Sequence, residues 1–146
     1  MYSATKEFNF EAGHCLDGHQ GKCKNLHGHN YKVFVTVSAS DLDKMNMVMD
    51  FYNLNTFAKP LFDEFDHAFI YNENCVDTFE KDLYEVCCKH NRKVKNFPAK
   101  ATAENMAKYF YMILNRRLSE SVNTEQITIS KVVVYETPTS YATYEG

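Results

Sequence analysis

The sequence predicts an α+β domain in which an antiparallel β-sheet carries helices on one face. Segments with alternating apolar residues, typical of strands, occur near both ends of the chain, and segments with apolar residues three and four positions apart, typical of helices, lie between them. The chain has 146 residues, of which 45% are hydrophobic and 24% are charged, as expected for a globular protein with a sizeable core. We therefore expect one domain spanning residues 1–146.

The first two strands are predicted at 2–12 and 29–38. Every second residue from Phe8 onward is apolar in the first strand, and Tyr31 starts a similar alternation in the second. Such alternation places one side of each strand in the core. The polar segment 15–26 is expected to be the loop between them, and we expect the two strands to pair antiparallel.

A first helix is predicted after Asn53, which is a suitable N-cap residue. Apolar residues from Leu54 to Phe65 follow it with helical spacing. Pro60 is expected to kink this helix or to begin its second half. The short apolar segment 47–51 before the helix is interpreted as the end of a strand.

A loop is predicted at 68–77, after which Thr78 is expected to cap a second helix that extends to His90. A histidine at that position is more typical of a helix end than of a metal ligand. The basic segment that follows carries a short predicted strand at 94–97.

A third helix is predicted to begin at the N-cap Thr102 and to bury an apolar stripe that extends to Leu118. Residues 119–125 are expected to be a polar connection. Two further strands follow at 127–137, which is rich in β-branched residues, and at 140–145.

Composition and charge exclude several classes of protein. A net charge of −3 does not provide the basic face that general nucleic-acid binding needs. No apolar run approaches the roughly 20 residues of a membrane span, and the first residues show no apolar segment typical of a signal peptide. The number of cysteines is odd and they form no C-x-x-C pair, which argues against a disulfide framework and favours a reducing cytoplasm. The cysteines are Cys15, Cys23, Cys75, Cys87 and Cys88.

A candidate metal site is formed by three histidines. His27 and His29 alternate with Gly28 at the entry to the second strand, so both imidazoles lie on one face and the other face stays open. His14 continues the apolar face of the first strand, and antiparallel pairing would bring it beside them. Three neutral imidazoles suit Zn²⁺ and leave a fourth position for water or substrate. The alternative is that they are polar residues at strand ends, solvated or bonded to the backbone.

Cys23 lies four residues before this H-x-H pair, between Lys22 and Lys24. Two lysines and a nearby divalent cation would favour the thiolate, which can act as a nucleophile or a general base. The spacing equally allows Cys23 to be a fourth zinc ligand that closes a structural site. The residues alone leave these two alternatives open.

Four acidic or basic residues are further candidates for a catalytic or ligand-binding role. Asp66 and His67 follow the first predicted helix, where a carboxylate could orient an imidazole as an acid or base; the ordinary interpretation is a polar helix end. Glu136 has the parity of the apolar residue Val134, and a carboxylate on an apolar face is costly unless it is paired or bound to a ligand. Glu104 suits the first turn of a helix by its charge, and a ligand role is also open.

These segments resemble the 6-pyruvoyltetrahydropterin synthase / 6-carboxytetrahydropterin synthase family. They occur in the order of the family and span almost the whole chain. The matching segments are Phe-Glu-Ala-Gly-His (10–14), Cys-Lys-Asn-Leu-His-Gly-His-Asn-Tyr (23–31), Met-Val-Met-Asp-Phe (47–51), Phe-Asp-His (65–67), Thr-Ala-Glu-Asn (102–105) and Val-Tyr-Glu-Thr (134–137).

The resemblance implies the tunnelling fold (T-fold), in a ββααββ arrangement with an extra helix in the insertion at 73–97. It implies homo-oligomers, either trimers or hexamers made of two trimers, with active sites between subunits. By position, it implies that His14, His27 and His29 bind zinc and that Cys23 is the general base.

Other positions of the family pattern imply further roles. Asp66 and His67 would complete the proton-transfer group, and Glu136 would anchor the pterin ring and join the charge relay. Thr102 and Glu104 match a helix start that lines the substrate pocket.

The resemblance further implies a substrate, 7,8-dihydroneopterin triphosphate, and a choice between two reactions. The short gap between Cys23 and the H-x-H pair resembles the enzymes that release acetaldehyde and form 6-carboxy-5,6,7,8-tetrahydropterin on the route to queuosine. The alternatives are the sister enzyme that forms 6-pyruvoyltetrahydropterin, and a non-catalytic, zinc-stabilised assembly module. Asp66, His67 and Glu136 disfavour the module, because a structural zinc site needs none of them.

Overall fold

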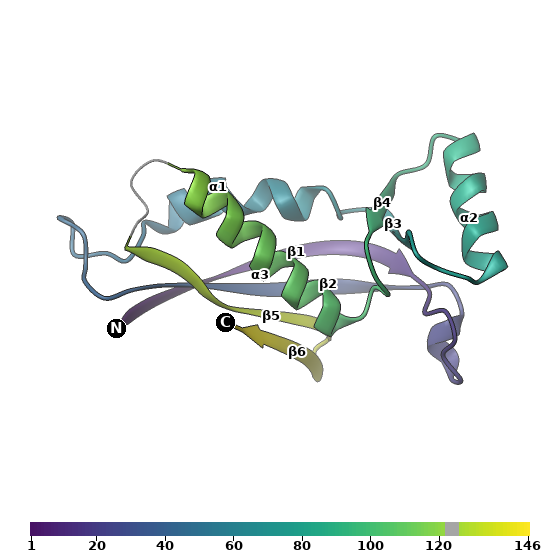
Figure 1. The fold of residues 1–146 in the computed structure, drawn as a ribbon, viewed down its shortest axis with the longest axis horizontal. Coiled ribbons are helices and arrows are strands. Elements are labelled where there is room, and N and C mark those ends of the chain that lie inside the picture. The colour runs from purple at the N-terminus through teal and green to yellow at the C-terminus, as the bar shows by residue number, and fades with distance from the viewer. Residues whose placement is uncertain (122–125) are drawn as a thin grey trace.

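The fold is built on a six-stranded sheet (Figure 1). The structure is a computed structural model that describes residues 1–121 and 126–146. The strands lie in the order β4-β3-β1-β2-β5-β6. In chain order the elements are β1 (Tyr2–His14), the short 3-10 helix η1 (Lys22–Lys24), β2 (His27–Ala39), α1 (Phe51–Asp63), β3 (Ala68–Asn72), α2 (Thr78–Lys89), β4 (Val94–Phe97), α3 (Ala103–Glu120), β5 (Ile127–Thr137) and β6 (Ser140–Glu145).

The four strands β1, β2, β5 and β6 pair antiparallel, as the sequence predicts. The strands β3 and β4 instead join the sheet parallel to β1 and to each other. Residues 68–72 were predicted as part of a loop, and this was wrong. Their apolar run, Ala68–Ile70, is too short to show an alternation, and the strand is defined by its pairing with β1 and β4 rather than by its own sequence.

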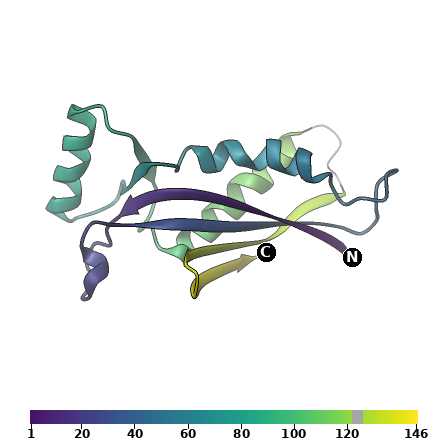
Figure 2. The ribbon, with the colours of Figure 1, turned by 180° about the vertical axis from the view of Figure 1, so that it is seen from behind.

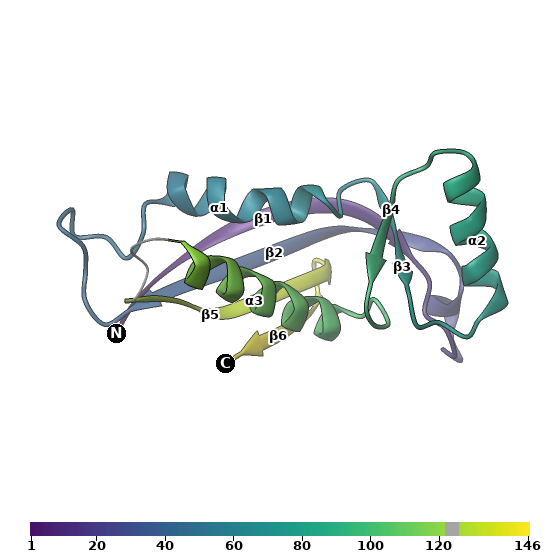
Figure 3. The same cartoon turned by 45° about the horizontal axis from the view of Figure 1, so that its top comes forward.

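The helices α1 and α3 cover the same face of the sheet, as predicted (Figure 3). Between them and the sheet lies an aromatic core in which Phe10 stacks on Tyr31 with ring centroids 4.8 Å apart, and Phe110 packs edge-on against Phe65 at 5.0 Å. These four side chains are almost completely buried. The core therefore fixes α3 against the two central strands.

The helix α2 stands apart from that core, at the end of the sheet where β1 ends (Figure 2). It contacts β3 and β4. The backbone N–H of Val76, just before α2, donates to the Asp17 carboxylate at 3.2 Å, which ties this segment to the loop between β1 and β2. The predicted helix and the predicted strand at 94–97 are both present.

The helix boundaries differ from the predictions by a few residues. Asp50, and not Asn53, caps α1, and its carboxylate accepts from the N–H of Tyr52 at 2.7 Å. The helix therefore begins inside the segment 47–51 that was predicted to end a strand, and Pro60 lies within a helix that continues to Asp63. An aspartate and an asparagine are equally good N-cap residues, so local sequence could not choose between these two positions.

The other two helix starts are closer to expectation. Asp77 caps α2, one residue before the predicted Thr78, and Thr102 caps α3 as predicted. The helix α3 continues to Glu120, two residues into the predicted polar connection. Of that connection, 122–125 lie outside the described residues. Among the helices of the described part of the chain, none is long and apolar enough to cross a bilayer.

The aromatic core gives a stability prediction. Phe110→Ala should lower the free energy of unfolding by roughly 3–5 kcal/mol, because it removes a fully buried ring and leaves a cavity. Met112→Ala on the same helix is the control, since Met112 is exposed. Urea denaturation followed by circular dichroism measures both variants. Equal losses in the two variants would contradict the assignment of this core.

Candidate metal centre and active site

The pairing of β1 with β2 brings the three predicted histidines together. His14 ends β1 and lies opposite His27, the first residue of β2, while His29 lies opposite Ala12. All three side chains are on the helix-covered face of the sheet, in line with Tyr31. Their potential ligand nitrogens lie within 4.8 Å of one another.

Backbone carbonyls fix which nitrogen of two of these rings carries the proton. The Nδ1–H of His14 donates to the carbonyl of Ala101 at 2.8 Å, and the Nδ1–H of His27 donates to the carbonyl of Asn25 at 2.7 Å. A carbonyl can only accept, so each Nε2 keeps its lone pair. These two Nε2 atoms face each other at 3.0 Å.

The third ring, that of His29, has a buried nitrogen, Nε2, without a hydrogen-bond partner among the described residues. Zinc binds histidine nitrogens at roughly 2.0–2.1 Å, so nitrogens 3.0 Å apart can share one ion. The buried orphan nitrogen and the two facing Nε2 atoms therefore fit a divalent metal held by three neutral imidazoles.

The local environment favours the neutral form of two of the histidines, His14 and His29. Burial, together with the neighbouring His27 and His29, lowers the pKa of His14 to about 4, against the raising effect of the Ala101 carbonyl. Burial, and then His27, also lowers the pKa of His29. Metal ligation requires the neutral imidazole, so the site favours the protonation state that a metal needs.

Tyr31 supports the cluster from the core side. Its side chain is fully buried, and its hydroxyl lies 3.3 Å from His14 Nδ1. Burial, with a smaller contribution from Glu136, raises the pKa of this phenol, so Tyr31 stays protonated. Together with the Ala101 carbonyl it holds the His14 ring in place, as outer contacts of metal ligands commonly do.

Two carboxylates lie beside the cluster. Glu136, near the end of β5, is half-buried, and its pKa is raised by burial and then by the charge of Glu104, while His27 lowers it. Glu104 belongs to the first turn of α3, and the hydroxyl of Thr102 caps that helix by accepting from the N–H of Asn105 at 3.2 Å. The start of α3 thus lies against the histidines, because Ala101 directly precedes the cap.

Cys23 lies in η1, outside the group of converging ligand atoms. It is half-buried, and its backbone carbonyl accepts from the N–H of Leu16 at 2.8 Å, which folds the loop back on itself. Among the described residues, the converging potential ligand atoms are therefore those of the three histidines, and the Cys23 thiol is not one of them.

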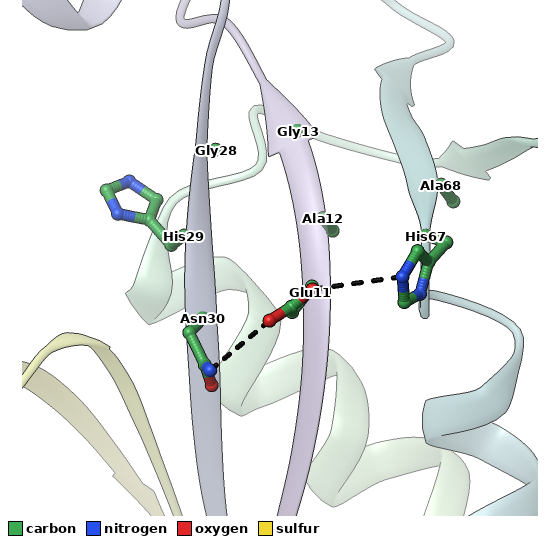
Figure 4. A pocket seen from close by; sticks show the side chains of 8 residues that line it. All are labelled: Glu11, Ala12, Gly13, Gly28, His29, Asn30, His67 and Ala68. Carbon is green, nitrogen blue, oxygen red and sulfur yellow. Dashed lines mark hydrogen bonds and ion pairs between the residues drawn. The ribbon is translucent and has the colours of Figure 1, made fainter.

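Asp66 and His67 are placed on the other side of the sheet. His67 Nδ1 lies 2.9 Å from the Asp66 carboxylate, and a hydrogen bond from the backbone N–H of Glu11, followed by the interaction with His67, lowers the pKa of Asp66. Glu11 alternates with Ala12 on β1 and so faces away from the histidine cluster. Figure 4 shows the ring of His29 directed away from Glu11 and His67. Within one chain, Asp66 and His67 do not meet the three histidines.

Sequence reasoning missed three groups at these sites. Tyr31 was predicted only as core, although it continues the alternation of His27 and His29. The Ala101 carbonyl carried no sequence signal, because any residue supplies one. Glu11 belongs to the Phe-Glu-Ala-Gly-His segment, and its position three residues before His14 was the available signal.

Comparison with known proteins agrees with this geometry. Residues 3–146 match the family model described as 6-pyruvoyl tetrahydropterin synthase. The chain is 39% identical to a 6-carboxy-5,6,7,8-tetrahydropterin synthase of Haemophilus influenzae, with 99% of each chain covered, and 38% identical to that of Aquifex aeolicus, with 99% and 98% covered. The structure resembles Caenorhabditis elegans 6-pyruvoyl tetrahydropterin synthase with a TM-score of 0.70, 25% identity and coverage of 99% and 95%. The three helices and the sheet form the T-fold of these proteins, and the chain belongs to the 6-pyruvoyl tetrahydropterin synthase family.

Proposed function

We propose that this chain is a zinc-dependent 6-carboxy-5,6,7,8-tetrahydropterin synthase. Its substrate would be 7,8-dihydroneopterin triphosphate, and its products 6-carboxy-5,6,7,8-tetrahydropterin, acetaldehyde and triphosphate, on the route to queuosine and other 7-deazapurines. The names of the relatives from Haemophilus influenzae and Aquifex aeolicus support the reaction. The observation that carries the proposal is the buried His29 Nε2, unpartnered among the described residues, beside two facing imidazole nitrogens.

Zinc would be held by His14, His27 and His29. When bound, it supplies Lewis-acid chemistry, which makes the C–H and O–H protons next to a coordinated hydroxyl easier to remove. The surroundings favour the neutral form of His14 and His29, and backbone carbonyls orient the rings of His14 and His27.

Cys23 would act as the general base. It lies outside the ligand group, so its thiol is not occupied by the histidine site. A thiolate there would take one proton from the substrate.

Asp66 and His67 would supply the second proton transfer, from a neighbouring subunit. Because they lie across the sheet from the histidines of their own chain, one chain cannot combine both groups. We propose that the protein is a homo-oligomer, a trimer or a hexamer of two trimers, whose active sites lie between subunits. Catalysis by such positioned acid–base groups typically contributes about 10²–10⁴-fold.

Glu136 would anchor the pterin ring. Its carboxylate is half-buried beside the histidines, where it can accept from ring N–H groups of a substrate. Thr102 and Glu104 at the start of α3 would line the same pocket. The five cysteines are free thiols, which supports a reducing, cytoplasmic location.

The sister reaction is the second candidate. The similarity to the Caenorhabditis elegans enzyme, which is named 6-pyruvoyl tetrahydropterin synthase, favours a product in which the three-carbon side chain is converted to a pyruvoyl group. A non-catalytic zinc module is disfavoured, because a closed structural site would need Cys23 among the ligands.

A product assay separates these functions. The zinc-loaded protein is incubated with 7,8-dihydroneopterin triphosphate, acetaldehyde is trapped, and products are identified by mass spectrometry. We expect acetaldehyde and 6-carboxy-5,6,7,8-tetrahydropterin in equal amounts. A 6-pyruvoyl product without acetaldehyde would assign the sister reaction, and no turnover by assembled, zinc-loaded protein would favour the module.

The metal ligands are tested by zinc content. A His27→Ala/His29→Ala variant should lose stoichiometric zinc and activity while keeping most of its secondary structure, because two of three ligands are gone. Elemental analysis and circular dichroism measure both properties. His90→Ala, at the end of α2, is the control and should keep its zinc. Full zinc occupancy in the double variant would show that other residues are the ligands.

The role of Cys23 is tested separately from its effect on the metal. Cys23→Ala should keep zinc and lower kcat by about 10²–10⁴-fold, because the base is removed but the ligands remain. Cys88→Ala, an exposed thiol on α2, is the matched control. Loss of zinc together with the thiol would instead support a fourth-ligand role, and unchanged turnover would exclude Cys23 as the base.

A further inference from the structure

Asp66 and His67 are both hydrogen-bonded to the backbone of one residue of β1, Glu11. The backbone N–H of Glu11 donates to the Asp66 carboxylate at 2.9 Å, and the backbone N–H of His67 donates to the Glu11 carbonyl at 2.6 Å. The main chain of Glu11 thus fixes the position of both members of the pair. The next residues, Ala12 and Ala68, continue this contact as a parallel strand pair.

The backbone of His67 needs such support. Its φ is 56°, in the left-handed region that residues other than glycine rarely adopt. Conformations of this kind persist where surrounding contacts determine them, and they cluster at functional sites. The hydrogen bond to Glu11 and the start of β3 provide those contacts and direct the imidazole over the open face of the sheet (Figure 4).

The side chain of Glu11 then faces the second nitrogen of the same ring. Glu11 Oε2 lies 3.8 Å from His67 Nε2, while the Asp66 carboxylate lies 2.9 Å from Nδ1. The amide of Asn30 lies 3.5 Å from the other Glu11 oxygen and restrains the carboxylate. Both ring nitrogens therefore face a negative charge.

The surroundings leave room for a reactant at this ring. Glu11, Asn30 and His67 border a hollow of about 470 Å³ whose floor includes Gly13 and Gly28, a cross-strand pair without side chains. The nearby Lys93 is a cation, but its ammonium donates to the carbonyls of Asp63 and Asp66. The charges that face the ring are thus the two carboxylates.

We propose that Glu11 is a positioning residue for the reaction and acts through His67. Its carboxylate aligns the ring and stabilises the imidazolium that forms when Nε2 takes up a proton, while Asp66 holds Nδ1. This inference rests on the proposed proton-transfer role of His67. It goes beyond that role because it adds a group on β1 that the substrate need not touch.

The first test compares Glu11→Gln with Glu7→Gln. Glu7 lies on the same strand and the same side of the sheet, and it pairs with Lys32 rather than with a histidine. We expect Glu11→Gln to lower kcat by roughly three- to tenfold with KM and zinc content unchanged, since exposed charge pairs contribute modestly. Glu7→Gln should retain the parental kcat. Equal kcat in the two variants, with an active parent, would overturn the inference and leave the proposed function intact.

A double-mutant cycle tests whether Glu11 acts through the imidazole. In a His67→Ala background, Glu11→Gln should cause no further loss of kcat, because the group that it positions is absent. An additional loss of the same size as in the parent would show that Glu11 acts independently, which would also overturn the inference.

A chemical measurement tests the same contact without turnover. Diethyl pyrocarbonate acylates the unprotonated imidazole, and peptide mass spectrometry reports its rate at His67. Glu11→Gln should raise that rate roughly two- to fivefold, because a neutral amide no longer holds Nε2 of the ring by charge across the 3.8 Å contact. Glu7→Gln should not change it. An unchanged rate of His67 acylation in Glu11→Gln overturns the inference, even if the parental protein has no enzymatic activity. If the acylation rate rises but the parental protein is inactive, the proposed reaction alone is refuted.

Discussion

The antiparallel register between β1 and β2 is the constraint on which the rest of the site depends. It sets His14 against His27 and Ala12 against His29, so two of the imidazoles come from one strand and the third from its neighbour at the same depth. Side chains alternate along a strand, and a slip of one residue would move a whole set to the other face. The buried aromatic residues further along the same strands, including Phe10 and Tyr31, oppose such a slip because it would expose them to water.

The core and the histidine cluster are therefore one continuous structure. Tyr31 contacts the aromatic core through its ring and His14 through its hydroxyl. The helix α3 also contacts the cluster. The carbonyl of Ala101, just before its cap, accepts from His14, and the first turn of the helix brings Glu104 near Glu136. A change in the packing of α3 should therefore change the orientation of the His14 ring.

The two faces of the sheet carry different groups of ionisable side chains. The helix-covered face holds the three clustered imidazoles, and the open face holds Asp66, His67 and Glu11 beside the glycine pair Gly13 and Gly28. Gly28 is well suited to the middle of this arrangement, because a Cβ there would lie 3.2 Å from the Ala12 carbonyl. The backbone of the sheet separates the histidine cluster from Asp66 and His67. This separation is the physical basis for expecting a site shared between subunits.

Much of this protein was determined by its sequence alone. The alternation of Phe8, Phe10 and His14, and of His27, His29 and Tyr31, is a local property, so it predicted both central strands and the common face of the histidines. The cap at Thr102 and the β-branched run that forms β5 were predicted for the same reason. Only the tertiary structure decided the parallel strand β3, the position of Cys23 outside the group of converging side-chain atoms, and the position of His67 across the sheet. These features depend on contacts between segments far apart in the chain, such as Glu11 with Asp66 and His14 with Ala101, and the periodicity of a single segment does not encode them.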